Sequence, residues 1–206
     1  NKGTDAAPDV FDVGQAIAAT STDYFAPYKV QAWDKIPDTA KDADGAYYAD
    51  YTGIMSVGWN ADKYGDISSL DDLIDSGQTG VVFDWTYNQA SYKKELKDKG
   101  VNWKYKTFPK AQVVSYYNQA INKDAPHPAA ARLWEEYLYT ADAQNLWFKG
   151  GANPVLLDSM KEDGTVDQAT LKDAITIEGE PVSYTNDDST RITEWLQNNW
   201  DKTIGN

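Results

Sequence analysis

The 206-residue chain contains no cysteine, so it has no disulfide framework, no thiolate nucleophile and no cysteine-based zinc or iron–sulfur site. Its single histidine, His127, excludes paired-histidine metal sites and leaves any Ser–His–Asp triad dependent on one ring. No apolar run approaches the ~20 residues that span a bilayer, and the start at Asn1 carries no basic-plus-apolar targeting segment. Triad hydrolysis therefore has little support, and we expect no membrane-spanning segment.

Nucleotide-binding motifs are also absent, because neither G-x-G-x-x-G nor G-x-x-x-x-G-K-[ST] occurs. The acidic stretch from Lys41 to Gly45 imitates a calcium loop. However, aligning Gly45 with the loop glycine puts Ala40 at the first ligand position and Tyr51 at the twelfth. We interpret this stretch as a turn, and we predict neither a cofactor nor a resident metal ion.

Negative charge and aromatic rings are what the chain has in excess. It contains 32 Asp and Glu against 19 Lys and Arg, a formal net charge of −13. This charge repels phosphate backbones and anionic membrane surfaces, so nucleic acid and lipid headgroups are poor partners. The chain also carries 8 Trp, 14 Tyr and 5 Phe, and we expect some of these rings to face a ligand.

The length allows one large domain or two small lobes. Strand and helix patterns alternate, which indicates an α/β layered fold with a largely parallel sheet. Strands are expected at residues 8–13, 51–60, 79–85, 102–108 and 112–122, and the second, third and fifth are expected to be buried. Helices are expected at residues 15–20, 70–74, 88–100, 128–140, 141–151 and 189–202. We expect core positions on the helices for Trp134, Trp147, Trp195 and Trp200, and a surface position for His127.

Residues 47–73 ("YYADYTGIMSVGWNADKYGDISSLDDL") and 115–155 ("SYYNQAINKDAPHPAAARLWEEYLYTADAQNLWFKGGANPV") together resemble the extracytoplasmic solute-binding proteins of ABC importers. The similar group includes binders of polyamines, ferric iron, thiamine and phosphonates, and residues 7–14 ("APDVFDVG") resemble its early strand and cleft loop. The resemblance implies a two-lobed, type II periplasmic-binding-protein-like α/β fold that clamps a solute by hinge closure. It also implies a non-enzymatic monomer that serves an ABC permease, either in the periplasm or lipid-anchored outside the cell.

The chain lacks two parts of the family pattern, one before "PDVFDV" and a long second-lobe stretch near Leu73 to Ser76. We expect an incomplete fold with a break near residues 73–76, because a lobe without its central strands would expose unpaired edges. A naturally reduced fold is the alternative. We assign residues 1–50 to part of the N-terminal lobe, 51–110 to the hinge strand and part of the second lobe, and 111–206 to the return to the N-terminal lobe and the C-terminal helices. Residues 51–60 and 115–122 should lie at the inter-lobe crossing.

Four clusters at strand ends are candidates for the solute site, with packing or surface roles as the alternative for each. The candidate ligand-binding residues are Asp12, Gln15, Tyr48, Asp50, Tyr51, Asp84, Trp85, Tyr87, Tyr116 and Tyr117. Asp84 breaks an apolar run, where a lone carboxylate is costly without a partner.

The solute is predicted to be a polyamine-like cation. Iron binders of the group resemble one another in adjacent tyrosines, and the matching place here, "DWTY", offers a lone Tyr87. Aromatic rings with Asp84 or Asp50 suit an ammonium group, through cation–π contacts of ~0.5–2 kcal/mol and a desolvated carboxylate. Ferric iron, or a phosphonate or carboxylate, is the alternative within the group. A carbohydrate-active hydrolase using Asp50 and Asp84 as an acid pair, or a stand-alone interaction domain, is an alternative outside it.

Overall fold

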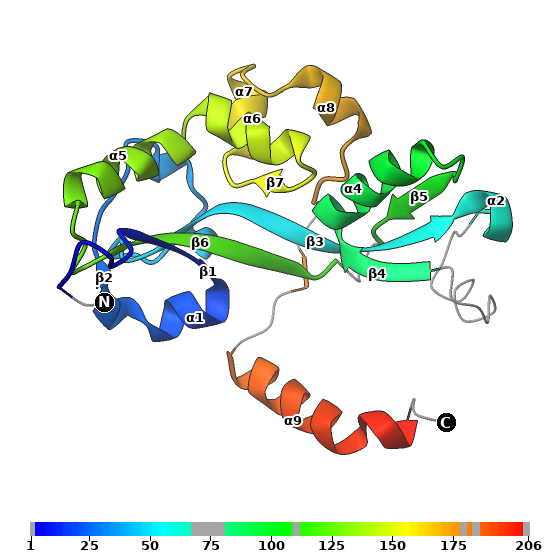
Figure 1. The fold of residues 1–206 in the computed structure, drawn as a ribbon, viewed down its shortest axis with the longest axis horizontal. Helices are drawn as coiled ribbons and strands as arrows, with labels where there is room; N and C mark the ends of the chain where they lie inside the picture. The colour runs from blue at the N-terminus through cyan, green and yellow to red at the C-terminus, as the bar shows by residue number, and fades with distance from the viewer. Residues whose placement is uncertain (1–2, 67–80, 109–111, 178–180, 183–185, 204–206) are drawn as a thin grey trace.

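The computed structural model describes residues 3–66, 81–108, 112–177, 181–182 and 186–203 (Figure 1). The helix expected at 70–74 and the break expected near 73–76 lie outside these residues. The strands are β1 (Val10–Gly14), β2 (Phe25–Ala26), β3 (Tyr48–Asn60), β4 (Val81–Trp85), β5 (Trp103–Lys106), β6 (Val114–Asn122) and β7 (Asn153–Pro154). The α-helices are α1 (Gln15–Thr20), α2 (Ala61–Tyr64), α4 (Thr86–Lys97), α5 (Pro128–Leu138), α6 (Ala141–Lys149), α7 (Leu157–Glu162), α8 (Gln168–Asp173) and α9 (Asn186–Thr203).

The 13-residue strand β3 runs through both halves of the seven-stranded sheet (Figure 1). Its first part, Tyr48 to Ile54, pairs with β6, and β6 also pairs with β1 and β2. Its second part, Met55 to Asn60, pairs with β4 on one edge and β5 on the other. We call β1, β2, β6, β7 and the first part of β3 the first half-sheet, and β4, β5 and the second part of β3 the second half-sheet, to which we also assign α4, the helix that joins β4 to β5. As predicted, residues 51–60 and 115–122 lie side by side where the halves meet.

The prediction of a largely parallel sheet is wrong. Every pairing between the described strands is antiparallel, and the one parallel contact is an isolated bridge between Val113 and Val182. The reason is that β4 and β5, joined by α4, flank β3 instead of pairing with each other. The β–α–β unit is therefore present, but an antiparallel strand separates its two parallel members.

Two buried clusters lie on the two faces of the first half-sheet, and a third, which includes Val57 and Trp59, lies at the second half-sheet. Helices α5, α6 and α7 cover one face, where Tyr48, Leu138 and Phe148 belong to the main buried cluster. Helix α1 covers the other face, where Ala18 and Ala120 belong to a smaller cluster. The core thus fixes the first half-sheet firmly at the point where β3 enters the crossing.

Several predicted core positions are exposed instead. Trp134 on α5 is 47% exposed, and Trp195 and Trp200 on α9 are 54% and 52% exposed. Strand β4 was expected to be buried, yet Phe83 is 62% exposed because β4 is covered by α4 on one face only. His127 is exposed, as predicted, and its ring contacts Asp9.

Within the described residues, no helix is both long enough and apolar enough to cross a bilayer.

Candidate solute-binding site

A cluster of aromatic side chains lies where the two half-sheets join. Tyr51 of β3 stacks on Tyr117 of β6, with ring centroids 4.7 Å apart and planes 9° apart. Trp147 of α6 stacks on Tyr51 at 4.6 Å. Tyr87 of α4 meets Tyr117 edge-on at 6.3 Å, and their hydroxyl oxygens are 2.8 Å apart. We call Tyr51, Tyr87, Tyr117 and Trp147 the tyrosine cluster, which brings together residues from both half-sheets.

Strand register and a glycine explain the geometry of the cluster. Tyr51 and Tyr117 are direct cross-strand partners, so both rings project from the same face. Gly53, two residues further along β3, leaves room for the rings of Tyr87 and Trp85. A Cβ atom at Gly53 would lie 2.9 Å from Cε1 of Tyr87 and 3.1 Å from Cε3 of Trp85. The residues at the junction of β4 and α4 therefore pack directly against β3 at Gly53.

Acidic groups border the tyrosine cluster. Burial raises the pKa of the Tyr51 and Tyr87 phenols, and the charge of Asp12 raises that of Tyr51 further. Asp50 is fully buried, and its carboxylate accepts hydrogen bonds from the Gln119 side chain at 3.2 Å and from the Tyr51 N–H at 3.1 Å. Burial, and then the charge of Asp12, raises the pKa of Asp50 well above its ordinary value. The surroundings thus disfavour further negative charge unless a cation is bound.

Asp84 lies near the end of β4, and its carboxylate is hydrogen-bonded by Trp85 and by side chains of α4. It accepts hydrogen bonds from the Trp85 N–H at 2.7 Å, from the Asn88 amide at 2.8 Å and from the Tyr92 hydroxyl at 2.8 Å. These hydrogen bonds together outweigh desolvation and lower the pKa of Asp84. The Asp84 carboxylate is therefore already hydrogen-bonded to Trp85, Asn88 and Tyr92 and is not a free counter-charge for a solute.

The other predicted residues divide between the crossing and the interior. Asp12 is exposed on β1, and partial desolvation raises its pKa. Gln15 begins α1 and accepts a hydrogen bond from the Asn118 amide at 3.1 Å. Tyr48 is only 2% exposed and packs between Trp33 and Tyr139 in the main core, instead of facing a solute.

Tyr116 is half-buried and packs against the same core cluster as Tyr48. Trp85 is also half-buried, beside Gly53 at the start of α4. The enzyme alternative loses its acid pair, since the carboxylates of Asp50 and Asp84 are each held by separate neighbours.

The sequence analysis missed two residues that shape the site. Trp147 was assigned to the core of α6, yet it is half-buried and stacks on Tyr51. Gln144, one helical turn earlier, is fully buried, and its amide donates to the backbone carbonyls of Asp50 and Leu138. The spacing of Gln144 and Trp147 on one side of α6 was visible in the sequence, but their partner strand was not.

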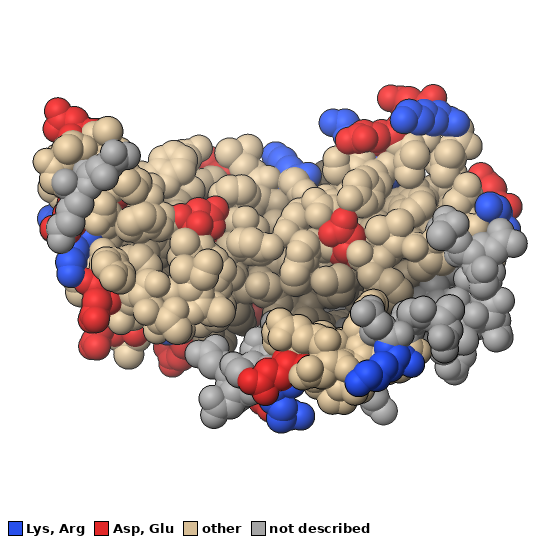
Figure 2. Space-filling model, turned by 60° about the horizontal axis from the view of Figure 1, so that its bottom comes forward, with Lys and Arg blue, Asp and Glu red and all other residues tan. Residues whose placement is uncertain are grey.

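The described residues contain no group of three or more His, Cys, Asp or Glu side chains arranged to hold a metal ion. The face shown in Figure 2 is largely uncharged at its centre, with isolated acidic groups there and the basic residues mainly toward its margins.

Comparison of the fold with solved structures shows what the chain is similar to. The ferric binding protein from Campylobacter jejuni matches with a TM-score of 0.67 at 12% identity, over 95% of this chain and 82% of that one. The Trichodesmium IdiA (FutA) protein, in complex with iron and citrate, matches with a TM-score of 0.66 at 15% identity, over 97% and 85%. The periplasmic binding protein AfuA from Actinobacillus pleuropneumoniae, with fructose-6-phosphate bound, matches with a TM-score of 0.63 at 15% identity, over 93% and 82%.

The chain therefore has the two-lobed type II fold of periplasmic solute-binding proteins. Part of each of these neighbours has no counterpart in the alignment, which agrees with the prediction of an incomplete fold. No protein-family model and no curated protein matches the sequence.

Proposed function

We propose that this protein is a non-enzymatic receptor that captures ferric iron at the tyrosine cluster and delivers it to an ABC importer. The observation that carries the proposal is the pair of hydroxyl oxygens of Tyr87 and Tyr117, 2.8 Å apart and contributed by the two half-sheets. A metal ion between them would tie α4 to β6, which is what closure of a cleft around a solute requires.

The chemistry of the cluster suits a hard, highly charged cation. Phenolates are oxygen ligands, and Tyr51 and Asp12 lie close enough to one another for the Asp12 charge to act on the phenol. A trivalent cation would compensate the negative charge that builds up when the phenols lose their protons. The structural neighbours include proteins described as ferric binding, which supports this assignment over the amine favoured from the sequence.

A polyamine-like cation is the second candidate. The rings of Tyr51, Tyr117 and Trp147 form a stacked surface, and an ammonium group is attracted to such faces. Asp12 would supply the counter-charge that Asp84 does not, because the Asp84 carboxylate already accepts hydrogen bonds from the Asn88 and Tyr92 side chains.

Titration with ferric citrate distinguishes the candidates, since coordinated phenolates give a visible phenolate-to-iron charge-transfer band. We expect the band in the wild-type protein, and we expect Tyr117→Phe to weaken iron binding by roughly tenfold or more, the equivalent of ~1.4 kcal/mol. Tyr137→Phe, an exposed site on α5, is the control and should change nothing. Calorimetric heat with putrescine or spermidine, together with no charge-transfer band with iron, would contradict the iron proposal and favour the amine as the solute.

The receptor role implies a location outside the cytoplasm and an ABC permease as partner, with lipid anchoring as one form of attachment. We also propose the lobe limits 1–50, 51–110 and 111–206. The change of partner strands along β3, from β6 up to Ile54 to β4 from Met55, supports a crossing within the second of these ranges.

A further inference from the structure

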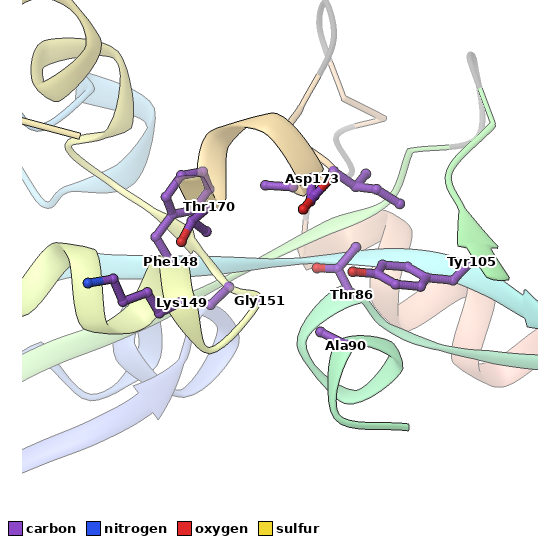
Figure 3. A pocket seen from close by; sticks show the side chains of 11 residues that line it. Thr86, Ala90, Tyr105, Phe148, Lys149, Gly151, Thr170 and Asp173 are labelled. Carbon is purple, nitrogen blue, oxygen red and sulfur yellow. The ribbon is translucent and has the colours of Figure 1, made fainter. Parts of the chain in front are cut away.

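A cavity lies between α4 and β5 on one side and α6 and α8 on the other (Figure 3). Its volume is about 130 Å³. Thr86 lines it, whereas the next residue, Tyr87, belongs to the tyrosine cluster. The two sites are therefore distinct, although both lie at the first turn of α4.

Thr86 contributes a buried hydroxyl that lacks a partner. The residue is 2% exposed, and its Oγ1 atom has no hydrogen-bond partner within the described part of the chain. Buried polar groups are nearly always hydrogen-bonded, so an orphaned hydroxyl on a cavity wall points to an occupant. In Figure 3 the oxygens of Thr86, Tyr105 and Asp173 are directed toward the same space.

The charged groups around the cavity leave one carboxylate uncompensated. Lys149 is ion-paired with Asp167 at 3.0 Å. The Nζ atom of Lys93 lies over the ring of Tyr105, 6.0 Å from the ring centroid. Asp173 forms no ion pair or hydrogen bond among the described residues, and its charge acts on the Tyr105 hydroxyl. Besides the paired Lys149, the polar groups of the wall are hydroxyls, which can accept hydrogen bonds, and the exposed carboxylate of Asp173.

Apolar atoms form most of the rest of the wall, from Ala90, Phe148, Ala152, Ala174 and Ile175, and Thr170 adds a side-chain hydroxyl. A volume of about 130 Å³ exceeds what a single water needs, ~10–15 Å³, and fits a molecule of a few heavy atoms. An occupant that matches both the acceptors and the apolar wall has a cationic donor group and a short hydrocarbon part.

We propose that this cavity binds a small organic ammonium ion, with Asp173 as its counter-charge and the hydroxyls of Thr86 and Tyr105 as hydrogen-bond acceptors. Because α4 belongs to one half-sheet and α8 lies beside the other, the bound ion links them. Occupancy then stabilises their arrangement independently of a solute at the tyrosine cluster.

Calorimetry with ethylammonium tests the proposal, with ethanol and acetate as the neutral and anionic probes. We expect heat with ethylammonium only. Asp173→Asn should weaken its binding by roughly tenfold, as expected for loss of a charge-assisted hydrogen bond, and Thr86→Val should weaken it by a smaller factor. Ala174→Leu, which fills the cavity, should abolish binding.

Controls separate this site from the tyrosine cluster and from simple loss of folding. Glu162→Gln removes one charge at the end of α7, away from the cavity, and should leave ethylammonium binding intact. Thr86→Val should also keep the unfolding midpoint at or above that of the wild type, because the hydroxyl it removes has no partner. Absence of heat, binding that survives both Asp173→Asn and Ala174→Leu, or binding lost in Tyr117→Phe but not in Asp173→Asn would each overturn the proposal.

Discussion

Glu135 is a buried carboxylate on the inner face of α5. It is 0% exposed, and neither carboxylate oxygen has a hydrogen-bond partner among the described residues. Burial raises the pKa of Glu135 from 4.5 to about 8, and the neighbouring Tyr48 hydroxyl offsets only part of this rise. The folded state therefore holds the proton more tightly than the unfolded state. Its contribution to stability is complete below pH 4.5 and is lost as the pH rises to about 8.

We expect Glu135→Gln to reduce this pH dependence, because the amide carries no charge at any pH. The slope should decrease by up to ~1.4 kcal/mol per pH unit between the two pKa values, while the part due to Asp50 remains. Urea unfolding at a series of pH values measures this slope of the unfolding free energy against pH. Glu136→Gln is the matched control, since Glu136 accepts hydrogen bonds from Tyr28 and Gln31. That variant should lose stability and keep the slope, and an unchanged slope in Glu135→Gln would contradict the assignment.

Iron binding should depend steeply on pH. Burial raises the pKa of the Tyr51 and Tyr87 phenols, so ferric iron must displace protons that the free protein holds tightly. The apparent affinity for iron should rise by roughly tenfold per pH unit for each proton released, as titrations at several pH values would show. An affinity that stays constant over the same range would mean that the phenols are not the ligands.

At the scale of the elements, Gly53 sets how closely α4 approaches β3. Gly53→Ala places a Cβ atom 2.9 Å from the Tyr87 ring, so we expect the ring to shift and the protein to lose ~1–3 kcal/mol of stability. Iron binding should weaken in the same variant. Gly14→Ala is the stability control, because Gly14 has φ −65° and a Cβ atom added there would meet no other atom within 4 Å. Equal unfolding midpoints for the two variants would contradict this account.

The helix α5 shows why a correct element can be given the wrong orientation. The sequence predicts the helix, and its apolar spacing places Ala130, Leu133, Trp134, Tyr137 and Leu138 on one side. In the structure the first four are exposed, and Leu138 alone of this set is buried, beside Ala131 and Glu135. Periodicity identifies a helix, but which side faces the sheet depends on the partner surface, and the polar Glu135 gave no signal of burial.

Across the whole molecule, Gly151 allows the turn between α6 and β7 to contact α4. Its φ of +88° favours glycine, and a Cβ atom there would lie 2.8 Å from Cβ of Ala90 and 3.0 Å from Cα of Tyr87. Gly151→Ala should therefore push α4 away and lower the unfolding midpoint.

The double variant Gly151→Ala/Ala90→Gly tests the cause of that loss. It relieves the Cβ contact but not the backbone strain, so we expect partial recovery of the unfolding midpoint. Small-angle scattering should show a larger radius of gyration for the single variant than for the double. No recovery in the double variant would assign the whole loss to strain at Gly151.

Long, nearly uncharged β segments are visible in the sequence without knowing their partners, whereas the crossing and the two-lobed fold were predicted from the resemblance to solute-binding proteins. The sequence could not predict strand direction, since the insertion of β3 between β4 and β5 is a tertiary event. Of the predicted site residues, Tyr51, Tyr87 and Tyr117 meet, whereas the Asp84 carboxylate is hydrogen-bonded by Asn88 of α4 and Tyr48 lies in the core. Side-chain direction after a β-bulge, as between Ala49 and Tyr51, is not readable from alternation.

The shared strand β3 also dictates the order of events during synthesis. The first half-sheet needs β6, whose residues pair with Val10 to Gly14 near the start and with β3 in the middle of the chain. These pairings close long loops, so the chain folds slowly compared with one built from local contacts. A nascent chain that ends before Val114 exposes β1 and β3 with open backbone edges, which invites association with other chains. A chaperone that covers these edges until β6 emerges would therefore protect the nascent chain from association.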